Sequence, residues 1–237
     1  MKINELFLEL QKLGLDLDDK KKKQLENFCV FLSEENTKTN LTGLKTKEEI
    51  YLKHIYDSLT LVKAIDFKSI KTLLDVGTGA GFPGIVIKIC FPNIEVTLID
   101  ANNKKCEFLE KATQQLKLTK TNIIQARAED YIVENRESFD LVTARAVANL
   151  RILAELCLPF VKINGNFIAM KSHVDEELDE AKETIELLGG SIEEIITLKL
   201  PIEKSLRTLV NIEKIQKTLL KFPRNYDRIL KYPLKKN

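Results

Sequence analysis

Residues 73–84 read LLDVGTGAGFPG, and this stretch decides the fold. An apolar run ends near a carboxylate, three glycines follow at alternate positions, and a proline leads into a new apolar segment. This order predicts a buried parallel strand, a tight loop and the first turn of a helix. Because glycine has no Cβ, such a loop can adopt positive φ angles and let a ligand lie against the backbone.

The spacing of the glycines distinguishes several kinds of nucleotide-binding loop. The dinucleotide fingerprint G-x-G-x-x-G needs its third glycine where Phe82 stands, and no lysine follows Gly84 as the phosphate-binding G-x-x-x-x-G-K-[ST] requires. The remaining pattern, acid-x-Gly-x-Gly-x-Gly beginning at Asp75, resembles the first motif of S-adenosylmethionine-dependent methyltransferases. Taken alone, the loop could also be only a tight turn.

A second signal follows about 20 residues downstream, at the distance that nucleotide-binding sheets use. Residues 95–100 form a short β-branched run that ends in the carboxylate of Asp100. Such an acid accepts hydrogen bonds from ribose hydroxyls, although by itself it could simply cap the following helix. Together with the glycine loop, it predicts cofactor contacts at Gly77, Gly79 and Asp100.

Length and composition limit the class of protein. The 237 residues suffice for one large α/β domain or for a domain with an appendage, and the net charge of +2 gives only a weak overall field. The apolar runs are too short to span a membrane, and the first residues lack a secretory hydrophobic region. These features predict a cytoplasmic protein without membrane contact, whose charged partners must be met by local patches.

The cysteines and histidines give no sign of a metal site. Only His54 and His173 are present, and no C-x-x-C spacing occurs, so we expect no bound metal. The cysteines lie within apolar helical patterns and read as reduced core thiols: Cys29, Cys90, Cys106 and Cys157.

Hydrophobic periodicity divides the chain into three parts. Residues 1–66 predict an N-terminal helical segment packed on the core, with one helix beginning after Thr46. Residues 67–215 alternate between strand and helix and close with two antiparallel strands, which predicts a Rossmann-like class I S-adenosylmethionine-dependent methyltransferase domain with a seven-stranded, mostly parallel sheet. Residues 216–237 read as a basic C-terminal tail.

In such a sheet the ligand crevice lies beyond the carboxyl ends of the strands. Glu129 follows the third strand, where an acid and a backbone amide could hold an adenine, although a solvated loop acid is the alternative. Arg145 ends the fourth strand, and a guanidinium there must meet an anion or a carbonyl. The crevice is therefore expected to bring together Gly77, Asp100, Ala128, Glu129 and Arg145.

His54 and Asp57 are three residues apart in a predicted helix, so both side chains can point the same way. One interpretation is that Asp57 holds His54 at a contact between helices. The other is that this helix forms a wall of the ligand pocket and directs polar groups into it.

Some acceptor chemistries can be excluded. Enzymes that methylate exocyclic amines carry [DN]-P-P-[YFW] after the fourth strand, where residues 144–148 read ARAVA. Carbon methylation of a pyrimidine needs a thiolate, and the nearest candidate, Cys157, reads as a core residue. An acceptor that is nucleophilic without deprotonation remains, and N7 of guanine is one. Its attack on a sulfonium methyl group requires mainly positioning and exclusion of water.

Several motifs together resemble the bacterial ribosomal RNA small-subunit methyltransferase G family, also called glucose-inhibited division protein B, over roughly residues 36–215. The motifs are NLTG (40–43), HIYDSL (54–59), DVGTGAGFPG (75–84), ARA (144–146) and MK (170–171). The resemblance implies methylation of N7 of one guanine in 16S (small-subunit) ribosomal RNA, with S-adenosylmethionine as donor. It also implies cofactor contacts at Gly77, Phe82, Ala128, Glu129 and Arg145. The first fifteen or so residues are generic.

The expected partner is 16S rRNA within the small ribosomal subunit or its precursor, bound by a monomeric protein. We assign the catalytic role to Arg145, and substrate contacts to His54 and to Lys171, which is expected to meet a phosphate near the pocket mouth. The basic tail, with interleaved aromatic residues, is a second candidate RNA contact. Alternatives are a methyltransferase for a protein or small molecule, a non-catalytic nucleotide-binding regulator and, least supported, a dehydrogenase.

Overall fold

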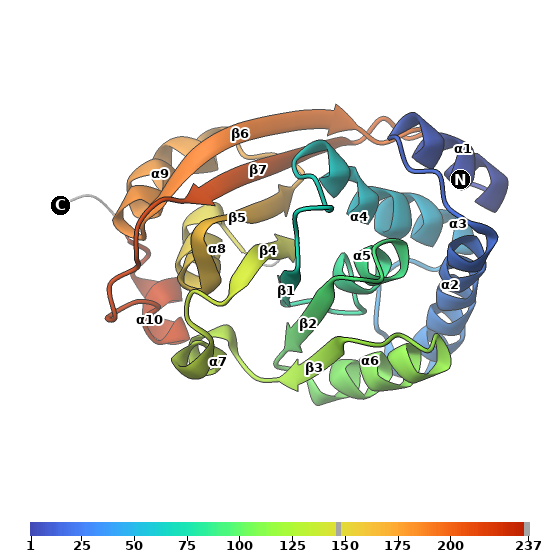
Figure 1. Cartoon of the computed structure of the whole chain (residues 1–237), viewed down its shortest axis with the longest axis horizontal. Coiled ribbons are helices and arrows are strands. Elements are labelled where there is room, and N and C mark those ends of the chain that lie inside the picture. Colours follow the sequence, from blue (N-terminus) through green and yellow to red (C-terminus); the bar gives the residue numbers. More distant parts are fainter. Residues whose placement is uncertain (146–147, 235–237) are drawn as a thin grey trace.

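A seven-stranded sheet runs through the centre of the molecule in the order β3-β2-β1-β4-β5-β7-β6 (Figure 1). The structure is a computed structural model that describes residues 1–145 and 148–234. The strands are β1 (Thr72–Val76), β2 (Glu95–Asp100), β3 (Thr121–Gln125), β4 (Phe139–Arg145), β5 (Val161–Lys171), β6 (Gly190–Lys199) and β7 (Leu206–Lys214).

The sheet has the strand directions that the sequence predicts. Strands β1 to β5 pair in parallel, whereas β7 runs antiparallel to both β5 and β6. The chain turns from β6 to β7 at residues 200–205, around the predicted turn at Pro201. The predicted fold class, a seven-stranded α/β sheet with a closing antiparallel pair, is confirmed.

The strand order reverses between β1 and β4, and this reversal positions the site. From β1 the chain moves outward to β2 and β3, then returns to β4 on the other side of β1. Val76 is paired with Ala144, so Gly77 and Arg145 follow at the same edge of the sheet. In open α/β sheets, ligands bind at such a switch point.

Alternate residues of the strands face opposite layers, as the period of two requires. Leu73 belongs to one buried cluster, with α5 (Gly84–Cys90), α6 (Asn103–Gln115) and the N-terminal helices. Leu74 belongs to the other, with α7 (Ala128–Asn135), α8 (Leu150–Cys157) and α9 (Asp175–Leu187). Figure 1 shows the two groups of helices on either side of the sheet.

The first 66 residues form helices joined by short loops. These helices pack on the same side of the sheet as α5 and α6. They comprise α1 (Ile3–Lys12), α2 (Asp19–Thr39), α3 (Lys47–Ile50), the π-helix η1 (Tyr51–Tyr56), α4 (Asp57–Leu59) and the 3-10 helix η2 (Thr60–Lys63). Thr46 caps α3 as predicted, because its Oγ1 accepts the N–H of Glu49 at 3.2 Å and the Glu49 carboxylate accepts the N–H of Thr46 at 3.2 Å.

The C-terminal segment is more ordered than a solvated basic tail. Residues 226–231 form helix α10 (Tyr226–Lys231), and the side chains of Phe222 and Ile229 are 3% and 0% exposed in the second buried cluster. The guanidinium of Arg224 binds Glu155 of α8 in a bidentate pair at 2.8 and 2.6 Å. Helices α7 and α10 were not predicted, and the tail lysines Lys235 and Lys236 lie outside the described residues.

Over residues 1–145 and 148–234, we find no helix that combines the length and the apolar character needed to cross a bilayer.

Candidate active site

Two cavities open at the carboxyl ends of the strands and share Gly77 and Arg145. The larger, about 710 Å³, is hereafter the large chamber, and the smaller, about 410 Å³, is the small chamber. Of the predicted site residues, the large chamber is lined by Gly77, Gly79, Phe82, Arg145, His54 and Lys171. The small chamber is lined by Gly77, Asp100, Ala128, Glu129 and Arg145. The structure thus brings all the predicted site residues into one two-chambered crevice.

Asp75 holds the glycine loop in place from beneath. Its Oδ2 accepts hydrogen bonds from Thr78 Oγ1 at 2.6 Å and from the N–H of Gly84 at 2.9 Å. The side chain is 0% exposed, and this burial raises its pKa to about 6. A Cβ at Gly84 would lie 2.2 Å from Leu98 Cδ2, so only glycine lets the loop approach β2 this closely.

Gly79 exposes its backbone to the large chamber. It adopts a φ of +62°, and a Cβ built on it would meet no atom within 4 Å. Its N–H donates to Asp100 Oδ2 at 3.0 Å, which joins the glycine loop to the end of β2. A side chain at this position would therefore occupy open space in the crevice instead of the protein core.

Asp100 has room for a further hydrogen bond. Its Oδ1 accepts the N–H of Asn102 at 2.9 Å, and its Oδ2 accepts from Gly79 and from Lys105 Nζ, the latter at 3.3 Å. A carboxylate offers about four acceptor positions, so one remains for a ligand hydroxyl. The alternative role of Asp100, capping the following helix, also holds in part, because Asp100 accepts the N–H of Asn102 and so stabilises the turn into α6.

Ala128 and Glu129 lie in the first turn of α7, on the wall of the small chamber. The N–H groups of a first helical turn lack partners within the helix, and they point toward its N-terminal end. Burial raises the pKa of the Glu129 carboxyl. An acid and the backbone amides of a first helical turn lie together here, and these are the groups that the predicted adenine contact requires.

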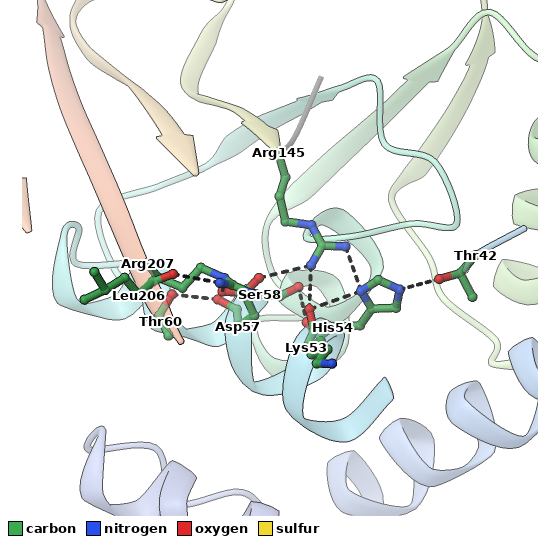
Figure 2. A network of polar contacts seen from close by, with 9 residues as sticks. All are labelled: Thr42, Lys53, His54, Asp57, Ser58, Thr60, Arg145, Leu206 and Arg207. Atoms are coloured by element: carbon green, nitrogen blue, oxygen red, sulfur yellow. Dashed lines mark hydrogen bonds and ion pairs between the residues drawn. The ribbon is translucent and has the colours of Figure 1, made fainter. Parts of the chain in front are cut away.

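Arg145 extends from the end of β4 onto the helical segment that carries His54 (Figure 2). Its Nη1 donates to the carbonyl oxygen of Lys53 at 3.0 Å and to Asp57 Oδ2 at 3.3 Å. Asp57 Oδ1 also accepts from Arg207 Nε at 3.0 Å, so one carboxylate binds two guanidinium groups. Arg145 was predicted to meet an anion or a carbonyl, and it meets one of each.

Nδ1 of His54 lies 3.0 Å from Arg145 Nη2 and 3.1 Å from the carbonyl oxygen of Lys53, and we assign it as the acceptor of the guanidinium. Because a guanidinium only donates, we place the imidazole proton on Nε2, which donates to Thr42 Oγ1 at 2.8 Å. Burial, and then the charge of Arg145, lowers the pKa of His54 to about 3, so the ring is neutral. His54 and Asp57 are therefore not paired with each other: both bind Arg145 and line the large chamber, the second of the two interpretations.

The helical turn that carries His54 is a π-helix, η1. Such turns are rare in proteins and are often found at functional sites. The π-helix lies between α3 and α4, and it presents the carbonyl of Lys53 and the ring of His54 to Arg145.

Phe82 lies beneath His54 as a stacking partner. The two rings are 4.3 Å apart at 25°, and the Arg145 guanidinium lies 5.3 Å from the Phe82 centroid. Phe82 is 3% exposed and also contacts Phe28 of α2, with a ring separation of 5.2 Å. Where a dinucleotide loop has glycine, this chain thus has an aromatic ring that supports the wall of the large chamber.

Lys171 lies at the end of β5 beside the large chamber, with its charge paired. Its Nζ donates to the carbonyl of Ala148 at 2.7 Å and contacts Glu177 Oε2 at 2.9 Å. A phosphate bound by Lys171 would compete with Glu177. The predicted contact to substrate stays a prediction.

Among the crevice residues that were not predicted as site residues are Thr42, Arg207 and Tyr226. Thr42 lies within the quoted NLTG motif, so the resemblance contained that signal. Arg207 on β7 and Tyr226 on α10 reach the crevice only through tertiary packing, and no local spacing pattern reveals them.

Cys157 is 0% exposed, and burial raises the pKa of its thiol well above the ordinary value. It therefore has neither the exposure nor the thiolate character of a nucleophile. In the described part of the chain, no three His, Cys, Asp or Glu residues are grouped so that they could hold a metal ion.

Comparison with known proteins gives one consistent family. A family model described as rRNA small subunit methyltransferase G matches residues 21–206. The ribosomal RNA small subunit methyltransferase G of Bacillus subtilis is 47% identical over 212 residues, covering 88% of this chain and 89% of that protein. The protein of the same name from Macrococcus caseolyticus is 46% identical over 209 residues, covering 86% and 88%.

Solved structures resemble the fold at low sequence identity. A SAM dependent methyltransferase from Aquifex aeolicus has a TM-score of 0.52 at 17% identity, covering 67% of this chain and 90% of that chain. M. jannaschii TYW2 in complex with AdoMet has a TM-score of 0.53 at 18% identity, covering 67% and 77%.

Proposed function

This chain belongs to the rRNA small subunit methyltransferase G family, and we propose that it transfers a methyl group from S-adenosylmethionine to N7 of a guanine in 16S rRNA. The observation that carries the proposal is the two-chambered crevice, whose chambers meet at Gly77 and Arg145. A donor in one chamber and an acceptor base in the other would place the reacting atoms where the chambers join.

The small chamber suits the adenosine part of the donor. Asp100 has an acceptor position for a ribose hydroxyl, and Ala128 and Glu129 offer amides and an acid for the adenine edge. Gly77 lines both chambers, and Gly79 leaves the backbone bare where the donor would pass toward the large chamber. When bound, the donor supplies an electrophilic methyl group, and the protein supplies its orientation.

The large chamber suits an acceptor that needs no general base. His54 Nδ1 is engaged by Arg145, and the ring's pKa of about 3 makes it a poor base. Asp57 is engaged by Arg145 and Arg207. N7 of guanine carries an in-plane lone pair and no hydrogen, so the transfer requires positioning and a dry site instead of deprotonation.

Arg145 is the residue to which we assign the catalytic role. It borders both chambers, and its guanidinium is fixed by Lys53, His54 and Asp57. We propose that this fixed group forms the boundary at which donor and base meet, with His54 and Lys171 contacting the substrate on the large-chamber side.

The proposed partner is 16S rRNA in the small ribosomal subunit or its precursor, a substrate that places the reaction in the cytoplasm. Support comes from the family and from basic side chains around the crevice mouth, among them Lys53 and Lys171. The monomeric state stays a prediction.

The test uses the purified protein with radiolabelled S-adenosylmethionine and three substrates: small subunits, naked 16S rRNA and a small-molecule extract. Labelled N7-methylguanine in the RNA is expected, and chemical cleavage at that base with primer extension maps the position. RNA from cells lacking the protein should lack the modification. Label in protein or small molecules would favour the other methyltransferase alternative, and donor binding without any product would favour a regulator.

A further inference from the structure

Tyr226 lines the small chamber from the C-terminal segment, outside the residues 21–206 that match the family model. It is the first residue of α10 and belongs to a part of the chain that reads, in sequence, as a basic tail. Its ring packs against the buried cluster formed by α7, α8 and α9, and the side chain is partly buried.

The ring of Tyr226 lies beside the residues to which we assign the adenine. The guanidinium of Arg127 lies over the Tyr226 ring, 5.1 Å from its centroid, and Arg127 directly precedes Ala128 and Glu129 in the chain. All four residues line the small chamber. The aromatic ring and the first turn of α7 are therefore two parts of the same wall.

Several contacts fix Tyr226 in this position. The carboxylate of Glu155, on α8 and 1% exposed, accepts the Arg224 guanidinium at 2.8 and 2.6 Å and the N–H of Arg224 at 2.9 Å. Arg136 donates to the carbonyl of Phe222 at 2.5 Å, and Asn225 caps α10 through the N–H of Asp227 at 3.1 Å. Ile229, 0% exposed in the same buried cluster, anchors the segment after position 226, so the segment presents a preformed surface instead of a mobile tail.

We propose that Tyr226 is a donor-binding residue, and that the part of its ring not covered by Arg127 packs against the adenine of S-adenosylmethionine. The inference rests on the proposed function and adds a specificity element to it. A flat aromatic surface favours a flat base by stacking, whichever hydrogen bonds its edge makes. The C-terminal segment is thereby part of the donor site.

Calorimetry with S-adenosylhomocysteine as the probe tests the proposal. Tyr226→Ala should weaken its binding about tenfold, the scale of lost base–aromatic stacking, whereas Tyr226→Phe should bind as wild type. Tyr226→Leu keeps an apolar side chain on α10 without a flat ring, and it should bind as weakly as alanine. Tyr232→Ala, at a 61% exposed tyrosine at the end of the same helix, is the matched control and should not change affinity.

Tyrosine fluorescence gives a second signal, which would not change on ligand binding if Tyr226 had only a structural role. The chain has five tyrosines and no tryptophan, so tyrosine dominates the emission. Stacking of adenine on Tyr226 should quench part of this emission when S-adenosylhomocysteine binds. The quenching should vanish in Tyr226→Phe, although that variant still binds.

The outcomes separate this inference from the proposed function. Wild-type protein that binds no S-adenosylhomocysteine or S-adenosylmethionine would overturn the proposed function. Wild-type binding with equal affinity in Tyr226→Leu, or quenching that persists in Tyr226→Phe, would overturn the role of Tyr226 alone.

Discussion

Arg145 donates a hydrogen bond to Nδ1 of His54 across 3.0 Å, and burial together with this contact keeps the imidazole neutral. A protonated ring would present an N–H to a guanidinium, so the folded protein holds His54 neutral, with its pKa lowered to about 3 by burial and by Arg145. The contact links β4 to η1 and joins the glycine-loop side of the crevice to the N-terminal helices.

The first prediction concerns the pH dependence of stability. Unfolded His54 takes up a proton near pH 6.5, whereas the folded ring does so only near pH 3. As the pH falls from 6.5 toward 3, the unfolded state binds the extra proton, so the free energy of unfolding must fall. Between pH 7 and pH 5 we expect this residue to account for about 1–2 kcal/mol of that loss.

Urea unfolding of wild type and His54→Gln at pH 7 and pH 5 measures this contribution. The variant should lose about 1–2 kcal/mol less than wild type on acidification, because the other titrating groups are common to both proteins. His173→Gln, at the other histidine and on the surface, is the matched control. Equal losses in wild type and His54→Gln would show that the folded ring titrates normally.

The second prediction concerns the carboxylate shared by two arginines. Asp57→Asn leaves Arg145 and Arg207 adjacent without an anion in a site where Asp57 is 3% exposed. Removing one partner of a buried ion pair costs about 3–5 kcal/mol, and urea unfolding should show a loss of this size.

The control for this variant is an ion pair on the surface. Asp179 and Lys182 are 86% and 59% exposed, so Asp179→Asn should change the free energy of unfolding by less than about 0.5 kcal/mol. If Asp57→Asn is as harmless as Asp179→Asn, the carboxylate is not needed to neutralise the two guanidinium groups.

The sequence predicts the sheet well because its signals are local. Apolar runs that end in a carboxylate or a turn mark β1 and β2, and β2 lies at the predicted residues 95–100. The capping pair at Thr46 and Glu49 is equally local and marks the start of α3. The parallel arrangement also predicts that the carboxyl ends of these strands lie at one edge of the sheet, where a ligand can bind.

What the sequence does not predict are contacts between distant residues. His54 and Asp57 are three residues apart, which suggests a pair, yet both bind Arg145, about ninety positions away in the chain. Arg207 and Tyr226 reach the crevice from strands and helices whose packing no local pattern encodes. The many charged residues of the C-terminal segment suggest a solvated tail, but Phe222 and Ile229 are buried and anchor the segment.

The third prediction concerns the proposed ribose contact. Asp100→Ala removes an acceptor for the sugar and also releases the N–H of Gly79, so donor affinity should fall by about 1–3 kcal/mol. Calorimetry with S-adenosylmethionine measures the loss, and a melting curve checks the fold. Glu107→Ala, at an exposed acid on α6 that binds Asn103, should leave the affinity unchanged. Unchanged affinity in Asp100→Ala would remove the ribose assignment.

The fourth prediction separates two glycines of the same motif. At Gly79 an alanine Cβ would meet no atom within 4 Å but would project into the crevice from a φ of +62°. Gly79→Ala should therefore cost only about 1–2 kcal/mol of stability through backbone strain, while donor binding is lost. At Gly84 the Cβ would lie 2.2 Å from Leu98 Cδ2 and 2.9 Å from Asp75 Oδ2.

Both neighbours of that Cβ are fully buried, so Gly84→Ala should lower the free energy of unfolding by about 3 kcal/mol or more. Urea unfolding and calorimetry on the two variants give opposite patterns: a folded protein that fails to bind donor at position 79, and a weakened fold at position 84. If Gly79→Ala binds S-adenosylmethionine normally, the donor does not lie against that backbone. The argument that the donor extends from the small chamber into the large chamber would then fail, even though the fold is that of the family.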